Sequence, residues 1–148
     1  MTETVLTLGA SVGGLAAIAA LADPAVAQRV AGLVLVDVVP EPEPDRVRAW
    51  LGDQGLGDQR ADLVEDILAS GSELHATAAA LDLPIVLVRA GRSPIGDADV
   101  DRFLAANRRV TSTVLPDVGH LVAKEAPTEL ARIVSAFATT WLTGRHSS

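Results

Sequence analysis

A serine set between two glycines has the residue type and spacing of a nucleophile. In the stretch Thr4–Leu21, the residues Gly9, Ser11 and Gly13 form the pattern Gly-x-Ser-x-Gly between a short apolar run and a run of small apolar residues. The pattern is typical of a sharp strand-to-helix turn that exposes the serine hydroxyl, with glycines where a Cβ would collide with the neighbouring strand or helix. The following helix would direct its first N–H groups at the serine. The stretch therefore predicts acyl transfer at Ser11, with the Val12 N–H as one oxyanion donor.

The same glycines allow a second interpretation, a phosphate-binding turn. The stretch approaches the dinucleotide-binding pattern Gly-x-Gly-x-x-Gly, with Ser11 in place of the middle glycine. Asp37, at the end of the next apolar run, could then contact a ribose hydroxyl. The middle glycine lets the pyrophosphate approach closely, so Ser11 counts against a half-Rossmann nucleotide-binding module without excluding it.

Composition limits the class of protein and its partners. The chain has 148 residues, 49% of them hydrophobic, which predicts one globular domain over residues 1–148. The net charge is −7 and no basic stripe is present, which argues against nucleic acid or an anionic membrane surface as a partner. Without cysteine, the chain has no disulfide framework, thiolate chemistry or Cys-ligated metal. We see no signal peptide or membrane span, so we expect a cytoplasmic protein.

Apolar runs alternate with helical patterns along the chain. The expected strands are Thr4–Leu8, Leu33–Val36, Leu83–Val88 and Val110–Leu115. The expected helices are Val12–Leu21, Arg46–Leu51, one from Asp58, Ser72–Leu81, one from Asp97 or Asp99, and one from Pro127. Strand–helix–strand units force parallel pairs, so we expect an α/β fold with a small open parallel sheet of about four strands and helical crossovers. Residues 41–81 would form a short helical cap, and residues 145–148 a disordered tail.

Chemically capable side chains follow the ends of these strands. Ser11 follows the first, Asp37 the second, Asp97 and Asp99 lie beyond the third, and His120 follows the fourth. In open parallel sheets the carboxyl ends of the strands share one crevice. We therefore expect these side chains to face the same crevice.

The order serine, acid, histidine resembles that of the α/β-hydrolase family. Val30–Pro40 looks like the family's strand after the nucleophile helix, Leu83–Gly91 like the strand before the acid loop, and Val114–Val122 like the strand and loop that carry the histidine. The resemblance covers nearly the whole chain, but only the C-terminal half of the family's fold. It implies a serine ester hydrolase without metal or cofactor. Ser11 would be the nucleophile and His120 the general base that returns the proton to the leaving group.

The chain departs from the family pattern at the acid. The usual acid position holds Pro94, which cannot orient an imidazole. Asp97 is the first expected substitute, and Asp99 and Asp37 are the alternatives. Each also has a structural interpretation, since Asp97 or Asp99 suits a helix N-cap and Asp37 a loop carboxylate.

A second departure concerns what would precede Thr4–Leu8. The family's N-terminal strands and the His-Gly-type loop that gives a second oxyanion donor are not found, which leaves this strand at the edge of the sheet. An exposed apolar edge invites pairing, so we expect a homodimer or a missing partner chain, or else a truncated product of a longer gene. The short 41–81 segment suits a small ester substrate. The alternative function is a non-catalytic remnant, or a subunit that pairs with another chain through the open edge.

Overall fold

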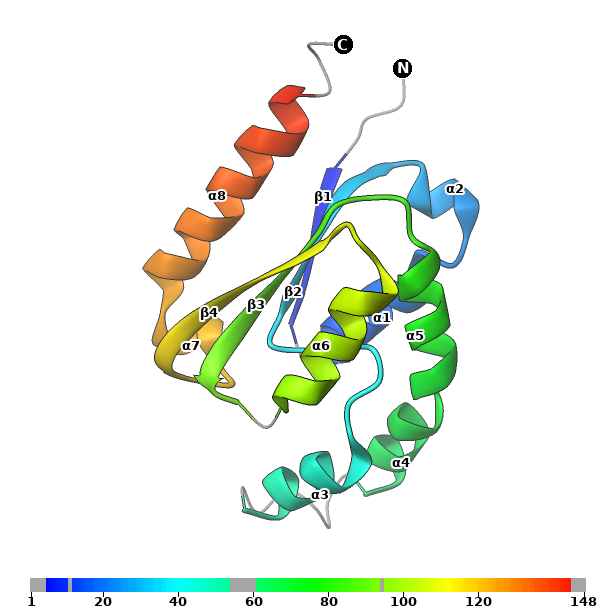
Figure 1. Cartoon of the computed structure of the whole chain (residues 1–148), viewed down its shortest axis with the longest axis vertical. Coiled ribbons are helices and arrows are strands. Elements are labelled where there is room, and N and C mark those ends of the chain that lie inside the picture. The colour runs from blue at the N-terminus through cyan, green and yellow to red at the C-terminus, as the bar shows by residue number, and fades with distance from the viewer. Residues whose placement is uncertain (1–4, 11, 54–60, 94, 145–148) are drawn as a thin grey trace.

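The fold is built on one parallel sheet. The computed structural model describes residues 5–10, 12–53, 61–93 and 95–144. Its strands run in the order β1 (Val5–Ala10), β2 (Val30–Val36), β3 (Ile85–Arg92) and β4 (Val110–Gly119), and each pairs in parallel with the next (Figure 1). The expected α/β fold with a four-stranded open sheet and helical crossovers is confirmed.

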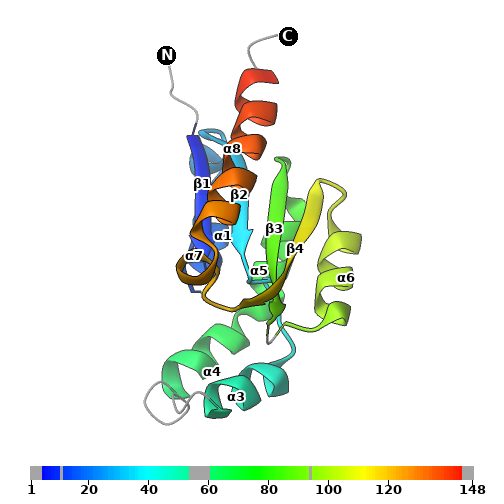
Figure 2. The same ribbon diagram turned by 90° about the vertical axis from the view of Figure 1, so that its left-hand side faces the viewer.

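Helices cover both faces of the sheet. They are α1 (Val12–Ala20), α2 (Pro24–Ala27), α3 (Pro44–Asp53), α4 (Ala61–Ala69), α5 (Gly71–Ala80), α6 (Asp97–Ala106), α7 (Val122–Glu125) and α8 (Pro127–Gly144). In Figures 1 and 2, α1, α5 and α6 lie on one face, and α7 and α8 on the other. Among the described residues, none of the helices combines the length and apolar character that a membrane crossing needs.

The inner strands β2 and β3 are mostly apolar on both sides because helices cover both of their faces. All seven residues of β2 are buried, as expected for an inner strand between two helical layers. Ile18, Leu33, Leu87 and Phe103 belong to the core under α1, α5 and α6. A second core, under α7 and α8, contains Val34, Val36, Val86, Val88, Ala90, Val122 and Leu130.

The segment between β2 and β3 contains α3, α4 and α5. The first two lie beyond the carboxyl ends of the strands, at the bottom of Figure 1. In contrast, α5 belongs to the sheet layer, because Ala78 is fully buried in the core with α1 and α6. In the part of this segment that the structure describes, α3 and α4 therefore stand where a cap over the strand ends would be. The expected tail at residues 145–148 lies outside the described residues.

The last strand differs from the sequence expectation. We expected it to end at Leu115 and a tight loop to follow, yet β4 continues to Gly119. Ala90 pairs with Leu115 and Arg92 with Gly119, so two steps along β3 correspond to four along β4. The extra length includes Asp117, whose backbone is left-handed at φ 64°. The strand bulges and bends, and this bend precedes His120.

The sheet has two edges, β1 and β4. The position of the first strand at an edge is therefore confirmed. On β1, the side chains of Val5 and Leu8 are 47% and 48% exposed, and on β4 Val114 is 48% exposed. Apolar side chains are thus half exposed at both edges of the sheet.

Candidate active site

Asp37 occupies the first position after β2 and is almost completely buried. Its residue is 1% exposed, and its backbone is left-handed at φ 51°, a conformation that Asp and Asn tolerate better than most residues. The Asp37 N–H donates to the Val88 carbonyl at 2.7 Å, which continues the β2–β3 ladder by one residue. The ladder and the left-handed turn together fix where the carboxylate lies.

Three donors bind the Asp37 carboxylate. The Ala90 N–H donates to Oδ1 at 2.9 Å, the Ser93 hydroxyl donates to Oδ2 at 2.8 Å, and His120 Nδ1 lies 2.8 Å from the same Oδ2. An ionised carboxylate only accepts, so Nδ1 is the donor in this contact, and a neutral imidazole bound in this way has its lone pair on Nε2. A buried carboxylate needs such partners, because burying one without them is costly. The arrangement holds the imidazole in the tautomer that a general base requires.

The bend at the end of β4 holds the histidine. The Gly119 N–H donates to Glu125 Oε1 at 3.2 Å, and Arg92 donates to the Asp117 carbonyl at 2.7 Å. The His120 side chain is 13% exposed. The hydrogen-bonded bend therefore holds the backbone of His120, Asp37 holds its ring, and the ring keeps some access to solvent.

The nucleophile position lies between β1 and α1. Ser11 itself is outside the described residues, but β1 ends at Ala10 and α1 begins at Val12. A Cβ on Gly9 would lie 2.5 Å from the Gly14 Cα, so the strand and the helix approach too closely for a side chain. Val12 begins the helix, where the first N–H groups have no partner within the helix.

One of the predicted glycine requirements is wrong. A Cβ on Gly13 would meet nothing within 4 Å, so the second glycine of the pattern is not needed for packing. Gly14 is the position without space, since a Cβ there would overlap the Val38 side chain and lie 3.2 Å from the Gly9 carbonyl oxygen.

Asp97, the first expected acid, and the alternative Asp99 are both bound elsewhere. Asp97 pairs with Arg89 at 2.9 Å and its side chain is 90% exposed. Asp99 is buried, but it accepts from the Glu43 N–H at 3.0 Å and pairs with Arg102 at 3.3 Å. His120 Nδ1 binds Asp37 instead. The structure thus corrects the preference for Asp97, and it places the carboxylate one strand earlier in the sequence.

Asp37 is not placed for a ribose hydroxyl. Its side chain is fully buried and its oxygens already accept from Ala90, Ser93 and His120. This finding removes the acid on which the nucleotide-binding interpretation depended. In the part of the chain that the structure describes, no three His, Asp or Glu side chains are grouped as metal ligands would be.

Ser93 and the Ala90 N–H are site groups that the sequence did not predict. Both depend on the register of β3 against β2, which places residues 90–93 beside Asp37. The only signal in the sequence was the position of Ser93 in the loop that follows the third apolar run.

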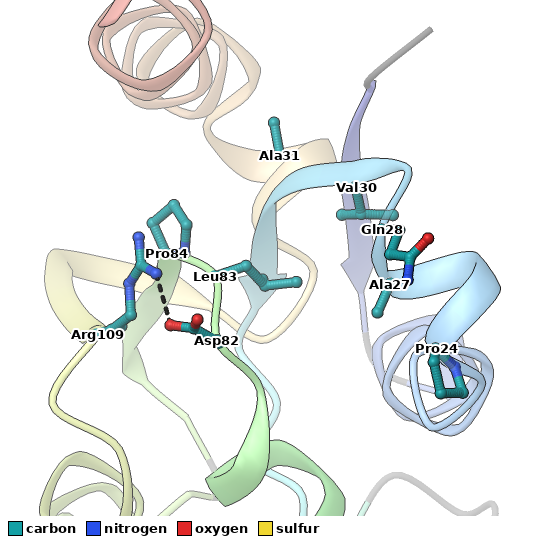
Figure 3. Close-up of a pocket in the computed structure, with 9 residues that line it drawn as sticks. All are labelled: Pro24, Ala27, Gln28, Val30, Ala31, Asp82, Leu83, Pro84 and Arg109. Carbon is teal, nitrogen blue, oxygen red and sulfur yellow. Dashed lines mark hydrogen bonds and ion pairs between the residues drawn. The ribbon is translucent and has the colours of Figure 1, made fainter. Parts of the chain in front are cut away.

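A surface hollow of about 560 Å³ lies at the other end of the sheet. Figure 3 shows it at the amino ends of β2 and β3, beside an ion pair between Asp82 and Arg109. It is lined by Pro24, Ala27, Gln28, Val30, Ala31, Asp82, Leu83, Pro84 and Arg109. Because Asp37 and His120 follow the carboxyl ends of their strands, the hollow does not belong to their site.

An exposed ion pair joins the two cap helices. Arg48 of α3 donates to both carboxylate oxygens of Glu65 of α4, at 2.8 and 2.9 Å. These hydrogen bonds hold the pKa of Glu65 below its usual value, and they raise the pKa of Arg48. The pair links α3 to α4 near the strand ends.

Solved structures share this fold. NosK from Streptomyces actuosus matches with a TM-score of 0.63 and 24% identity, over 90% of this chain and 68% of its own. N-formylmaleamic acid deformylase from Pseudomonas putida S16 matches with a TM-score of 0.64 and 21% identity, over 90% of this chain and 66% of its own. A thermophilic esterase from Thermogutta terrifontis matches with a TM-score of 0.64 and 18% identity, over 94% of this chain and 65% of its own.

Sequence comparisons add nothing to these matches, because no protein-family model and no curated protein sequence matches the chain. The similar structures have the α/β-hydrolase fold, and the chain spans about two thirds of the length of each. The strand order, the crossovers and these matches together show that the chain has the α/β-hydrolase fold, over part of the length of its structural relatives.

Proposed function

We propose that this protein is a serine hydrolase that cleaves small carboxylic esters. The observation that carries the proposal is the contact of 2.8 Å between His120 Nδ1 and the buried Asp37 carboxylate. A neutral histidine oriented through Nδ1 by a buried carboxylate presents Nε2 as a base, which is the arrangement that activates a serine. Ser11 is the serine that the sequence offers at the carboxyl end of the neighbouring strand.

The reaction would proceed in two acyl transfers. Ser11 Oγ attacks the ester carbonyl while His120 Nε2 takes its proton, and the Val12 N–H donates to the oxygen that becomes negative. The tetrahedral intermediate expels the alcohol, which receives the proton from His120, and an acyl-enzyme remains. Water then attacks the acyl carbon, again with His120 as base, and releases the acid and Ser11.

Asp37 acts through the imidazole in this scheme. It holds the proton on Nδ1 and stabilises the imidazolium that forms when Nε2 takes the serine proton. Its three donors keep the carboxylate in place during this change. Asp37, rather than Asp97, is therefore the acid that we propose.

Two observations support a small ester as substrate. Among the described residues, α3 and α4 are the elements that stand beyond the strand ends, and two short helices would surround a small acyl group better than a large one. Of the similar structures, one is named as an esterase and another as a deformylase. Both names describe acyl transfer, the reaction class that we propose for this chain.

An activated serine can be tested without knowledge of the substrate. A fluorophosphonate reacts with such a serine, so the intact mass of the chain is measured after incubation, beside the variants Ser11→Ala and His120→Ala. We expect one adduct on the wild type and none on either folded variant. A folded wild type that gains no mass contradicts the proposal.

We also propose that a second copy of the chain pairs along β1. This strand is an edge of the sheet, and its Val5 and Leu8 side chains are about half exposed. An edge with unpaired backbone groups and apolar side chains is a template for another strand, and a symmetric pair would bury the same surface twice. The exposed apolar edge is the observation behind the second candidate function, a non-catalytic subunit that acts by association.

A further inference from the structure

The loop after β3 brings a hydroxyl to the acid. Ser93 donates to Asp37 Oδ2 at 2.8 Å, the same oxygen that receives His120 Nδ1. We propose that Ser93 is a positioning residue for the Asp37–His120 pair, an inference that rests on the proposed function. Ser93 is the first residue after β3, in the loop where the family pattern places the acid. In this chain the loop instead supplies a hydrogen-bond donor to Asp37, which follows β2.

The direction of the Ser93 hydrogen bond is fixed by a second contact. The Ile95 N–H donates to Ser93 Oγ at 3.0 Å, which occupies an acceptor site of the hydroxyl. The hydroxyl has one proton, and Asp37 Oδ2 is the acceptor placed to receive it. Ser93 is therefore held as a donor to the carboxylate.

The three donors constrain different parts of the carboxylate. The Ala90 N–H fixes Oδ1 from β3, whereas Ser93 and His120 approach Oδ2 from the β3–α6 loop and from the end of β4. Without the Ser93 hydroxyl, Oδ2 would keep the imidazole contact but lose the donor that fixes its direction. The carboxylate could then turn with the ring, and Nε2 would lose its alignment.

Loss of the Ser93 hydroxyl should slow the labelling reaction by the amount that one hydrogen bond to a charged group contributes. We expect Ser93→Ala to slow fluorophosphonate labelling by about 10- to 100-fold, and Ser93→Thr, which keeps a hydroxyl, to restore most of the rate. The matched control is Ser72→Ala. The Ser72 hydroxyl, in α5, also donates to a carboxylate, that of Glu41 at 2.8 Å, but this hydrogen bond is exposed. This control should label at the wild-type rate.

A spectroscopic readout separates positioning from mere folding. In ¹⁵N-histidine NMR, the His120 signals are assigned by their loss in His120→Gln. The wild type should show one tautomer with the proton on Nδ1, and Ser93→Ala should show faster exchange of that proton or a mixture of tautomers. Ser93→Thr and Ser72→Ala should match the wild type. If Ser93→Ala does not fold, Ser93→Cys, whose thiol is a weak donor, takes its place.

The outcomes distinguish this inference from the proposed function. Unchanged His120 signals and an unchanged labelling rate in a folded Ser93→Ala variant would overturn the positioning role. A wild type that does not label would instead reject the hydrolase, and the NMR comparison would still decide whether Ser93 positions the pair.

Discussion

His120 Nδ1 lies 2.8 Å from Asp37 Oδ2, although the two residues are 83 positions apart and follow strands that are not neighbours in the sheet. The contact crosses the end of β3, where Ala90 and Ser93 bind the same carboxylate. Segments after β2, β3 and β4 thus meet at one buried acid. This convergence is the basis for assigning the chemistry to the carboxyl ends of the strands.

The two glycines at the start of α1 should respond oppositely to alanine. Gly14→Ala should lower the free energy of unfolding by about 1–3 kcal/mol, because its Cβ would overlap Val38 and crowd the Gly9 carbonyl. Gly13→Ala should raise it by about 0.5–1 kcal/mol, because the site is open and alanine favours the helix. Urea unfolding measures both values. Equal effects of the two substitutions would contradict the packing of α1 on β1.

The edge of β1 should determine association. The wild type is expected to sediment at about twice the chain mass of 15.3 kDa. Leu8→Lys should give a monomer, because charge on an edge strand opposes pairing. Val114→Lys, on the other edge and equally exposed, is the control and should leave the dimer intact. A monomeric wild type would reject the proposed pairing, and loss of the dimer only in Val114→Lys would move it to β4.

The Arg48–Glu65 pair should make a small, pH-dependent contribution to stability. The pKa of Glu65 is lower in the folded chain, so its contribution is present above its ordinary value of 4.5 and is lost as the pH falls through the folded value. Glu65→Gln should therefore be less stable than the wild type at pH 7, and the difference should vanish in acid. It should also shrink in 1 M salt, because the pair is exposed. A difference that persists at low pH would contradict this account.

The two inner strands could be predicted from sequence because both of their faces are buried. Leu33–Val36 and Leu83–Val88 read as continuous apolar runs. The first lies within β2, and the second overlaps β3, which begins at Ile85 and continues to Arg92. The extension of β4 could not be predicted in the same way. It depends on a register shift against β3 and on the left-handed backbone of Asp117, which are tertiary features.

The carboxylate that contacts His120 could not be predicted from the sequence for a related reason. Distance along the chain favoured Asp97, which follows the third strand as the family pattern suggested. Which carboxylate meets His120 depends on how β2 and β3 align, and this alignment places Asp37 beside Val88 and Ala90. Residue types identified the three candidates, and only the register of the sheet decided among them.

The central claim, that Asp37 orients the histidine that activates Ser11, predicts different effects for two aspartates. Asparagine suits the left-handed backbone of Asp37, so Asp37→Asn should fold. Its carbonyl must face the Ala90 N–H, which leaves the NH₂ group against His120 Nδ1 and moves the ring proton to Nε2. The imidazole would then have the wrong tautomer for a base. Asp97→Asn is the matched control, because Asp97 is exposed and bound to Arg89.

The most direct test is the rate of fluorophosphonate labelling of the wild type, Asp37→Asn and Asp97→Asn, with circular dichroism to confirm that each is folded. We predict that Asp37→Asn labels on the order of 10³- to 10⁴-fold more slowly than the wild type. Asp97→Asn should stay within about threefold of the wild-type rate, as for a surface change. Normal labelling of Asp37→Asn, or a large loss confined to Asp97→Asn, would contradict the assignment of Asp37 as the acid.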